Sequence, residues 1–407
     1  MGALQGLRVL DLTRVFAGPW ATQMLADFGA DVVKVEHPAG GDDVRRMGMH
    51  QKRPDGSETG QTSSFLAMNR GKRSVALDMA KPEGRAALQA MAAKADVLVE
   101  NFKTGGLRKY GLDYASVSAA NPRLVYCSIT GYGQDGPNAA LPGYDPIFQA
   151  ISGLMSITGQ PEGEPGAGPA VVGYSVSDIN AGFYATIAIL TALRARDAVT
   201  GRGQHIDIAL LDTQIAAHSH IAMNYLVSGQ VPVRAGTASQ INTPWQSFPT
   251  ADVPVMIAVG NDRQFATLCT ALEIPDVGTD GRFTSNRQRW ANKPALIALL
   301  EAALARRGAR DWTDRLNAAG IACGPLNDFA AVAEDLQVMH RGLFREMPDP
   351  ACGTLKFVGN PVRLSDTPAE YRRPPPRLGE HSAEVLRDWL SMDEAGLAAV
   401  AAETAPR

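Results

Sequence analysis

The chain has 407 residues, with 39 Lys and Arg against 42 Asp and Glu, so its formal net charge at pH 7 is −3. This length predicts two or three domains that fold without disulfide support. The balanced charge gives no sign of a nucleic-acid partner. The N-terminus shows no signal-peptide pattern and no run is long enough to span a bilayer, so we expect a cytoplasmic protein with no membrane partner.

Strands and helices alternate through the first half of the chain. The short apolar runs predict strands at 7–12, 31–36, 74–78, 95–100, 124–129 and 203–210. Helical patterns lie between or after them, at 17–27, 81–93, 178–196 and 213–227. Such alternation is typical of parallel strand pairing, so the predicted fold class is α/β with a doubly wound parallel sheet.

The pattern changes near residue 228, where Gly229, Pro232, Gly236 and Pro244 indicate a linker. A smaller α+β unit should follow, with a strand at 255–259 and helices near 263–272, 293–306 and 312–319. Gly324-Pro325 marks a second break, before a strand at 354–358 and a last helix at 382–390. The expected domain boundaries are therefore 1–228, 229–325 and 326–407.

Two patterns suggest cofactor sites and do not hold up. Gly131 to Gly136 matches GxGxxG after a strand, but Pro137 and Pro142 interrupt the helix that a dinucleotide fingerprint requires. His218 and His220 have a spacing that occurs in metal sites, yet on a helix they point to different faces. The four cysteines form no CxxC or Cys/His cluster. We therefore expect neither a nicotinamide or flavin cofactor nor a metal.

Asp178 precedes a long apolar run at 185–193, and this local pattern predicts a helix N-cap. Backbone donors and the helix dipole would hold an N-cap carboxylate ionised. An ionised carboxylate is also a possible nucleophile. The two interpretations are compatible, and the sequence offers no Walker loop, metal-ligand cluster or Ser-His-Asp order as another centre of chemistry.

Asp178, together with Gly143-Tyr144-Asp145, resembles the active-site stretch of the family III (CaiB/BaiF) CoA-transferases. Further matching segments follow in order along the chain, at 11–19, 29–36, 69–74, 100–102, 131–133 and 373–381. The resemblance implies a Rossmann-like large domain built from both ends of the chain, a small domain, and an interlocked homodimer. It also implies that Asp178 attacks an acyl-CoA thioester and that Tyr144 and Asp145 are further catalytic residues. The CoA thioester is then a substrate, and no cofactor is needed.

The resemblance further implies where CoA binds. Val15 and Ala17 in the first loop, with His37 after the second strand, would line the adenine and pantetheine. Lys72, with Arg73 beside it, would meet the phosphates. A solvated basic turn is the alternative for these two cations.

Other CoA contacts are expected at the ends of later elements. Asn101 and Phe102 end a strand, where open α/β sheets bind ligands. Lys109 and Tyr110 would cover the nucleotide, with Arg108 in the place of Lys109 if the register differs by one residue.

Departures from known branches bear on the substrate. Phe16 stands where formyl-CoA transferases carry Gln, which argues against formate and oxalate. Tyr144 stands where the racemase branch carries an acid/base His, a role that Tyr cannot fill near neutral pH. The likeness at 219–226 and 260–266 is to succinyl-CoA:glutarate (dicarboxylate) CoA-transferases.

The resemblance therefore implies CoA transfer from succinyl-CoA to a short dicarboxylate. Arg14 and Arg45 are candidate partners for the distal carboxylate, because a guanidinium pairs with a carboxylate in bidentate fashion. The alternative is that Arg14 supports a strand end and Arg45 lies on the surface. The competing functions are a 2-methylacyl-CoA racemase or acyl-CoA isomerase, and a CoA- or nucleotide-binding module without chemistry.

Overall fold

The computed structural model describes residues 2–404 and divides into two compact units. The larger unit contains the chain up to Leu154, Val172–Gln230 and the part from His340 onward, so both ends of the chain build it. The smaller unit contains Met155–Val171 and Val231–Met339. Its first segment, which the sequence had assigned to the large domain, is tied in by backbone contacts: Gly236 N donates to Gly159 O at 2.9 Å.

A six-stranded parallel sheet forms the centre of the larger unit. Its strands lie in the order β10 (His205–Ala209), β7 (Val125–Thr130), β6 (Val97–Glu100), β1 (Arg8–Asp11), β2 (Asp31–Glu36) and β5 (Arg73–Ala76). Numbered along the chain, this is the 3-2-1-4-5-6 order of a doubly wound Rossmann-type sheet. The predicted α/β class is confirmed. The strand order reverses between β1 and β6, where such sheets bind ligands.

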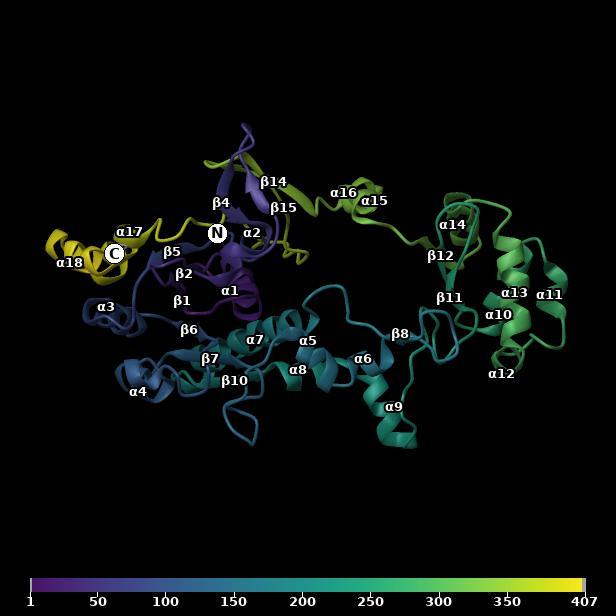
Figure 1. The fold of residues 1–407 in the computed structure, drawn as a ribbon, viewed down its shortest axis with the longest axis horizontal. Helices are drawn as coiled ribbons and strands as arrows, with labels where there is room; N and C mark the ends of the chain where they lie inside the picture. Colours follow the sequence, from purple (N-terminus) through teal and green to yellow (C-terminus); the bar gives the residue numbers. More distant parts are fainter. Residues whose placement is uncertain (1, 405–407) are drawn as a thin grey trace. The chain divides into compact units, whose positions relative to one another are not determined.

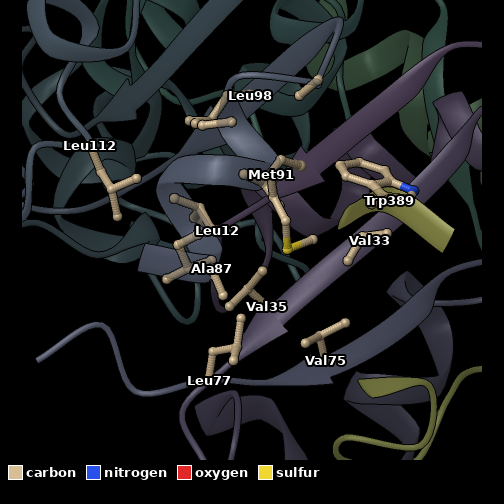
Figure 2. Packing of buried hydrophobic residues seen from close by; sticks show 14 of the residues in the cluster. Leu12, Val33, Val35, Val75, Leu77, Ala87, Met91, Leu98, Leu112 and Trp389 are labelled. Carbon is tan, nitrogen blue, oxygen red and sulfur yellow. The ribbon is translucent and has the colours of Figure 1, made fainter. Parts of the chain in front are cut away.

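Successive residues of each strand face opposite sides of the sheet, and each side carries its own hydrophobic core. Val9 and Val97 pack with α1 (Ala17–Asp27) and α7 (Val176–Ala195). On the other side, Val33 and Leu98 pack with Met91 and Trp389, as Figure 2 shows. That side is covered by α3 (Pro82–Ala92), α4 (Tyr114–Ala120), α17 (Ser382–Leu390) and α18 (Glu394–Thr404) (Figure 1).

Helix α7 lies directly against α1. A Cβ atom on Gly182 would be 2.8 Å from Ala17 O, so this glycine allows the two helices to approach closely. The contact brings the first turn of α7 near the loop between β1 and α1. The prediction that no run is long enough to span a bilayer is wrong, because within residues 2–404 the helical segment Val176–Thr200 is long and apolar enough to do so. A single helix of this kind is weak evidence for a membrane span, and one face of α7 packs into the core of this unit.

The remaining elements of the larger unit are short. They comprise the hairpins β3 (His50–Lys52)–β4 (Glu58–Thr62) and β14 (Phe344–Asp349)–β15 (Gly353–Val358), the 3₁₀ turns Asp43–Arg46 and Arg108–Tyr110, and α2 (Ser63–Met68), α5 (Asp145–Ile151), α8 (Leu210–Ala217) and α9 (His220–Ser228). Helix α6 (Leu154–Ile157) begins at the last residue of the first segment of this unit and belongs otherwise to the smaller unit. The single helix predicted at 213–227 is wrong. Ser219 has φ +45°, which a right-handed helix does not accommodate, and it separates α8 from α9.

The smaller unit is α+β, as predicted. Its antiparallel sheet joins β11 (Trp245–Phe248), β12 (Val255–Ala258) and β13 (Ala322–Pro325). Phe265, Leu300 and Trp312 form its core. Its other elements are β8 (Gly159–Gln160), β9 (Gly168–Pro169), α10 (Asp262–Ala271), α11 (Pro275–Thr279), α12 (Asn286–Ala291), α13 (Lys293–Leu304), α14 (Ala309–Ala318), α15 (Phe329–Glu334) and α16 (Leu336–His340).

Candidate active site

A cavity of about 250 Å³ opens at the carboxyl ends of the central strands, where the strand order reverses. Its wall comes from the segments that follow β1, β6, β7 and β10, and from the first turn of α7. The lining residues are Arg14, Val15, Phe16, Ala17, Asp43, Asn101, Phe102, Lys103, Thr104, Ile129, Thr130, Gly131, Ala139, Leu141, Pro142, Gly143, Tyr144, Asp178 and Leu210.

The loop between β1 and α1 is held in a strained shape at this cavity. Val15 has φ +69°, which is an outlier for a β-branched residue. Its N–H donates to Asp42 Oδ1 at 3.0 Å. The backbone of Arg14, which precedes Val15, is also fixed. The side chain of Asn101 accepts a hydrogen bond from Arg14 N at 3.0 Å and donates one to Arg14 O at 2.7 Å. Strain of this kind persists where surrounding contacts enforce it, often at functional sites.

Buried ion pairs support the same loop from beneath. Lys72 Nζ lies 3.0 Å from Asp11 Oδ2, and Lys34 Nζ lies 2.8 Å from Asp42 Oδ2, all with fully buried side chains. Burial alone would raise the pKa of Asp11, but Lys72 and Lys34 hold it well below its usual range. Burial lowers the pKa of Lys72 to about 8 despite the attraction of Asp11. These charges are structural partners of each other.

Asp178 is not the N-cap of α7, and that prediction is wrong. The helix begins at Val176, its N-cap is Ser175, and Ser175 makes no side-chain capping bond. Asp145 on α5 supplies the cap instead. Its Oδ1 accepts from Ser177 N at 2.7 Å and from Asp178 N at 3.4 Å. Asp178 is therefore the third residue of the helix and lines the cavity.

The charge state of Asp178 also differs from the expectation of a carboxylate held ionised. Burial, followed by the nearby carboxylate of Asp145, raises the pKa of Asp178 to about 7. The helix dipole favours the anion, but burial and the second carboxylate outweigh it. Near neutral pH the residue is present in both protonation states. A carboxylate this basic is a stronger nucleophile than an ordinary surface aspartate.

The structure brings together most of the candidate residues on the first loop and the later strand ends. Arg14, Val15, Phe16 and Ala17 line the cavity with Asn101, Phe102, Tyr144 and Asp178. Asp145 lies behind this wall and is 6% exposed. The sequence analysis missed Lys103, Thr104, Thr130 and Leu141. Lys103 and Thr104 directly follow Asn101-Phe102 after the end of β6, so their position in the sequence could have indicated that they line the site.

Three predicted cationic contacts are engaged elsewhere. Lys72 donates to Asp11, Pro19 O and Asn69 inside the core. Arg73 pairs with Asp31, Glu384 and Asp388. Arg45 forms a bidentate pair with Glu36, both bonds at 2.7 Å. The solvated turn considered for Lys72 and the surface position considered for Arg45 are wrong too, because all three cations are buried. We assign them no ligand.

The remaining candidates lie outside the cavity lining. His37 follows β2, is largely exposed, and its Nε2 lies 3.7 Å from Asp78 Oδ2. Arg108 and Lys109 are exposed on the 3₁₀ turn, and Lys109 Nζ lies over the ring of Tyr110. His37 shares the carboxyl edge of the sheet with the cavity. Its role, and that of the 3₁₀ turn, stays a prediction.

Within residues 2–404, no group of three or more His, Cys, Asp or Glu side chains is arranged to hold a metal ion. His218 is the C-cap residue of α8 and its Nε2 lies 3.4 Å from Gln214 Nε2, whereas His220 begins α9. The glycine motif at 131–136 opens no helix in the structure, since the next helix is α5. A Cβ on Gly131 would lie 2.6 Å from Phe148 Cζ, so this glycine allows close packing beside the cavity.

Comparison with known proteins agrees with this geometry. The family model described as CoA-transferase family III matches residues 4–382. A succinate–glutarate CoA-transferase of Agrobacterium fabrum is 44% identical over 96% of each chain. An acetyl-CoA:oxalate CoA-transferase of Acetobacter aceti is 38% identical, again over 96% of each. A crystal structure of a CaiB/BaiF family protein from Brucella suis has a TM-score of 0.86 at 42% identity, covering 95% of this chain and 99% of that one.

The chain therefore belongs to CoA-transferase family III. The predictions of an enzyme, and of this family, are confirmed.

Proposed function

We propose that this enzyme moves CoA from succinyl-CoA to glutarate or a related short dicarboxylate, with Asp178 as the covalent nucleophile. The observation that carries the proposal is the position of Asp178, half-buried in the wall of the cavity at the switch point of the sheet. The substrate pair is supported by the similarity to a relative named for succinate and glutarate.

The chemistry exchanges one acyl bond for another at each step. The Asp178 carboxylate attacks the thioester carbonyl of succinyl-CoA, the C–S bond breaks, and a mixed anhydride and CoA thiolate form. The thiolate attacks the aspartyl carbonyl, which releases succinate and leaves an aspartyl-CoA thioester. A carboxylate of glutarate attacks this thioester, its C–S bond breaks, and a second mixed anhydride and the CoA thiolate form. The thiolate then attacks the glutaryl carbonyl, which yields glutaryl-CoA and regenerates Asp178. The overall transfer of CoA from one carboxylic acid to another is nearly isoenergetic, so we propose that the reaction needs no cofactor.

Two cationic side chains at the cavity suit anionic substrates. Arg14 and Lys103 are both exposed and line it. No carboxylate within residues 2–404 pairs with the guanidinium of Arg14, whose Cζ lies 5.3 Å from the centre of the Phe102 ring. We assign Arg14 to the distal carboxylate of the dicarboxylate. Val15, Ala17, Asn101 and Phe102 border the path for the CoA thioester.

The substrate proposal is tested with a panel of acceptor acids. The purified enzyme is incubated with succinyl-CoA and glutarate, oxalate, mesaconate, malate or butyrate, and the CoA products are identified by mass spectrometry. We expect glutaryl-CoA or another dicarboxylyl-CoA to dominate and butyryl-CoA to be minor. Preferential formation of oxalyl-CoA, or equal use of butyrate, would overturn the assignment.

A racemase is the alternative within enzymes of acyl-CoA, and Tyr144 argues against it. Tyr144 lines the cavity, is 72% exposed, and occupies the place at which the racemase branch has a histidine. The decisive measurement is the reaction of a 2-methylacyl-CoA in deuterated water. We expect no deuterium at Cα on the timescale of CoA transfer, whereas incorporation at the turnover rate would move the protein to the racemase branch.

We also propose that two copies form an interlocked homodimer, located in the cytoplasm. The support is the family resemblance together with large apolar side chains exposed on α7 and α9. Ile187 is 61% exposed, Leu226 70% and Val227 79%. Large apolar side chains exposed on a surface are typical of association surfaces. Light scattering after size-exclusion chromatography should give twice the mass of the chain, and a monomer at assay concentration would contradict the proposal.

A further inference from the structure

Two side chains of α5 lie behind the nucleophile and are almost fully buried, with Asp145 6% and Gln149 1% exposed. Gln149 Nε2 donates to Asp145 Oδ2 at 2.7 Å, and Gln149 Oε1 accepts from Val172 N at 2.8 Å. The other carboxylate oxygen of Asp145 accepts from Ser177 N. The amide of Gln149 thus fixes the orientation of the carboxylate, and the carboxylate fixes the start of α7.

The charge of Asp145 is not neutralised by a cation. No Lys, Arg or His side chain within residues 2–404 forms an ion pair with Asp145 or with Asp178. The other titratable groups that face the cavity are Arg14, Asp43, Lys103 and Tyr144. On α8, His218 meets Gln214, whose Oε1 accepts from Ser177 Oγ and Asn180 Nδ2. Asp145 is the group that acts on the charge of Asp178 most directly.

We propose that Asp145 is a positioning residue that raises the reactivity of the Asp178 carboxylate by holding a second negative charge beside it, and that Gln149 keeps that charge in place. This inference rests on the proposed role of Asp178. Repulsion destabilises the Asp178 anion before reaction and disappears once that oxygen is acylated, so it favours attack on the thioester. The same carboxylate also orders the first turn of α7, which carries the nucleophile.

Three variants separate the charge from the hydrogen bonds. Asp145→Asn removes the charge and keeps an oxygen that accepts from Ser177 N. The double variant Asp145→Asn/Gln149→Glu reverses the polarity of the 145–149 hydrogen bond, keeps an acceptor for Val172 N, and moves the charge from residue 145 to residue 149, four positions along α5. Asp113→Asn is the matched control, because Asp113 is a partly exposed residue at the N-cap of α4, and its side chain accepts a hydrogen bond from Ser116 Oγ.

Two readouts are measured for each variant: the pH profile of kcat/KM, and the titration of the Asp178 carboxyl carbon by ¹³C NMR with Asp178→Asn as the assignment reference. In Asp145→Asn we expect both midpoints to fall by about 1–2 pH units, and the rate at high pH to fall about 3–10-fold because a less basic nucleophile reacts more slowly. The double variant should lie between Asp145→Asn and the wild type. Asp113→Asn should match the wild type.

A purely structural role gives a different result. Asp145→Asn would then lower the rate with unchanged midpoints, and the double variant would restore the rate, which would overturn the inference. The NMR titration needs no turnover, so it decides the question even if the enzyme transfers no CoA. Failure of the proposed function and failure of this inference are therefore distinguishable. If Asp145→Asn does not fold, the same comparison is made between the double variant and the wild type.

Discussion

Asp11 is a fully buried and Asp178 a half-buried carboxylate of the larger unit, and their surroundings give them opposite properties. Asp11 receives hydrogen bonds from Thr13 and Thr22 and lies beside Lys72 and Lys34, which hold its pKa far below the usual range. Asp178 has no cationic partner within residues 2–404, and burial with a second carboxylate raises its pKa to about 7. Removing one partner from a buried ion pair destabilises the fold because it leaves a buried charge uncompensated, whereas an unpaired charge at a cavity is available for chemistry.

The largest effect is expected from substitution of Asp178, the carboxylate that we propose to be reactive. Asp178→Ala should lose roughly four or more decades of kcat, because the covalent intermediate cannot form. Steady-state assays with succinyl-CoA and glutarate measure the loss, and unchanged circular dichroism shows that the variant is folded. Asp178→Asn should behave alike if mass spectrometry shows no deamidation. Near wild-type activity of Asp178→Ala would remove Asp178 from the mechanism.

The structural role of Asp11 is tested by breaking its ion pair with Lys72. Lys72→Met leaves Asp11 buried with one cation fewer, and such a loss typically costs about 3–5 kcal/mol of the free energy of unfolding. Urea denaturation measures it. The matched control is Arg282→Met, which breaks the exposed pair with Asp280 and should change stability by at most about 1 kcal/mol. Equal effects of the two substitutions would contradict the assignment of Lys72 to the structure.

Stability should also depend on pH through Asp178. Its pKa is about 7 in the folded protein, against an ordinary value of 3.8. Between these values the folded state retains the proton that the unfolded state releases, so this group lowers stability as pH rises. Asp178→Asn removes the effect. We expect a gain of up to about 4 kcal/mol at pH 8, at 1.36 kcal/mol per pKa unit, and a clearly smaller gain at pH 5.

Urea denaturation of the wild type and Asp178→Asn at both pH values provides the comparison. Asp11→Asn should behave in the opposite sense, destabilising the protein more at pH 8 than at acid pH, because the pKa of Asp11 is lowered by folding. A pH-independent difference between Asp178→Asn and the wild type would contradict the raised pKa of Asp178.

The smallest effect is expected in a comparison of Arg14, which forms no ion pair within residues 2–404, with Arg45, which is paired with Glu36. Arg14→Ala should reduce kcat/KM for glutarate by about one to two decades, the equivalent of 1.5–3 kcal/mol for a charged hydrogen bond, and leave butyrate unaffected. Arg45→Ala is the control, because Arg45 is locked to Glu36. It should reduce stability and change both acceptors alike. A selective loss of glutarate in Arg45→Ala would restore that residue as a substrate contact.

The parallel sheet could be predicted from the sequence because a strand buried on both faces is a continuous apolar run. The β3–β4 hairpin escaped prediction, since His50–Lys52 and Glu58–Thr62 are polar and show no alternation. The break between α8 and α9 depends on the backbone of Ser219, which has no compositional signal.

In the candidate site, too, some residues could be predicted from the sequence and others could not. The segments around residues 14–17 and 144–145 were placed by the resemblance to the family. Residues 101–102 were also expected at the site because open parallel sheets bind ligands where their strands end. Lys72 was misplaced because its partner, Asp11, is 61 residues away along the chain, so its burial cannot be inferred from neighbouring residues. The cap of α7 likewise comes from Asp145, 32 residues before Ser177. Long-range pairs of this kind are visible in a structure alone.

Trapping of the covalent intermediate tests the central claim most directly. The wild-type enzyme is incubated with succinyl-CoA and quenched with hydroxylamine, and its peptides are analysed by mass spectrometry, with Asp178→Ala and Asp145→Asn treated in parallel. We predict a hydroxamate on Asp178 that requires succinyl-CoA and is absent from Asp178→Ala. Turnover without modification of Asp178, or a succinyl-CoA-dependent hydroxamate on another carboxylate, would contradict the assignment of Asp178 as the nucleophile.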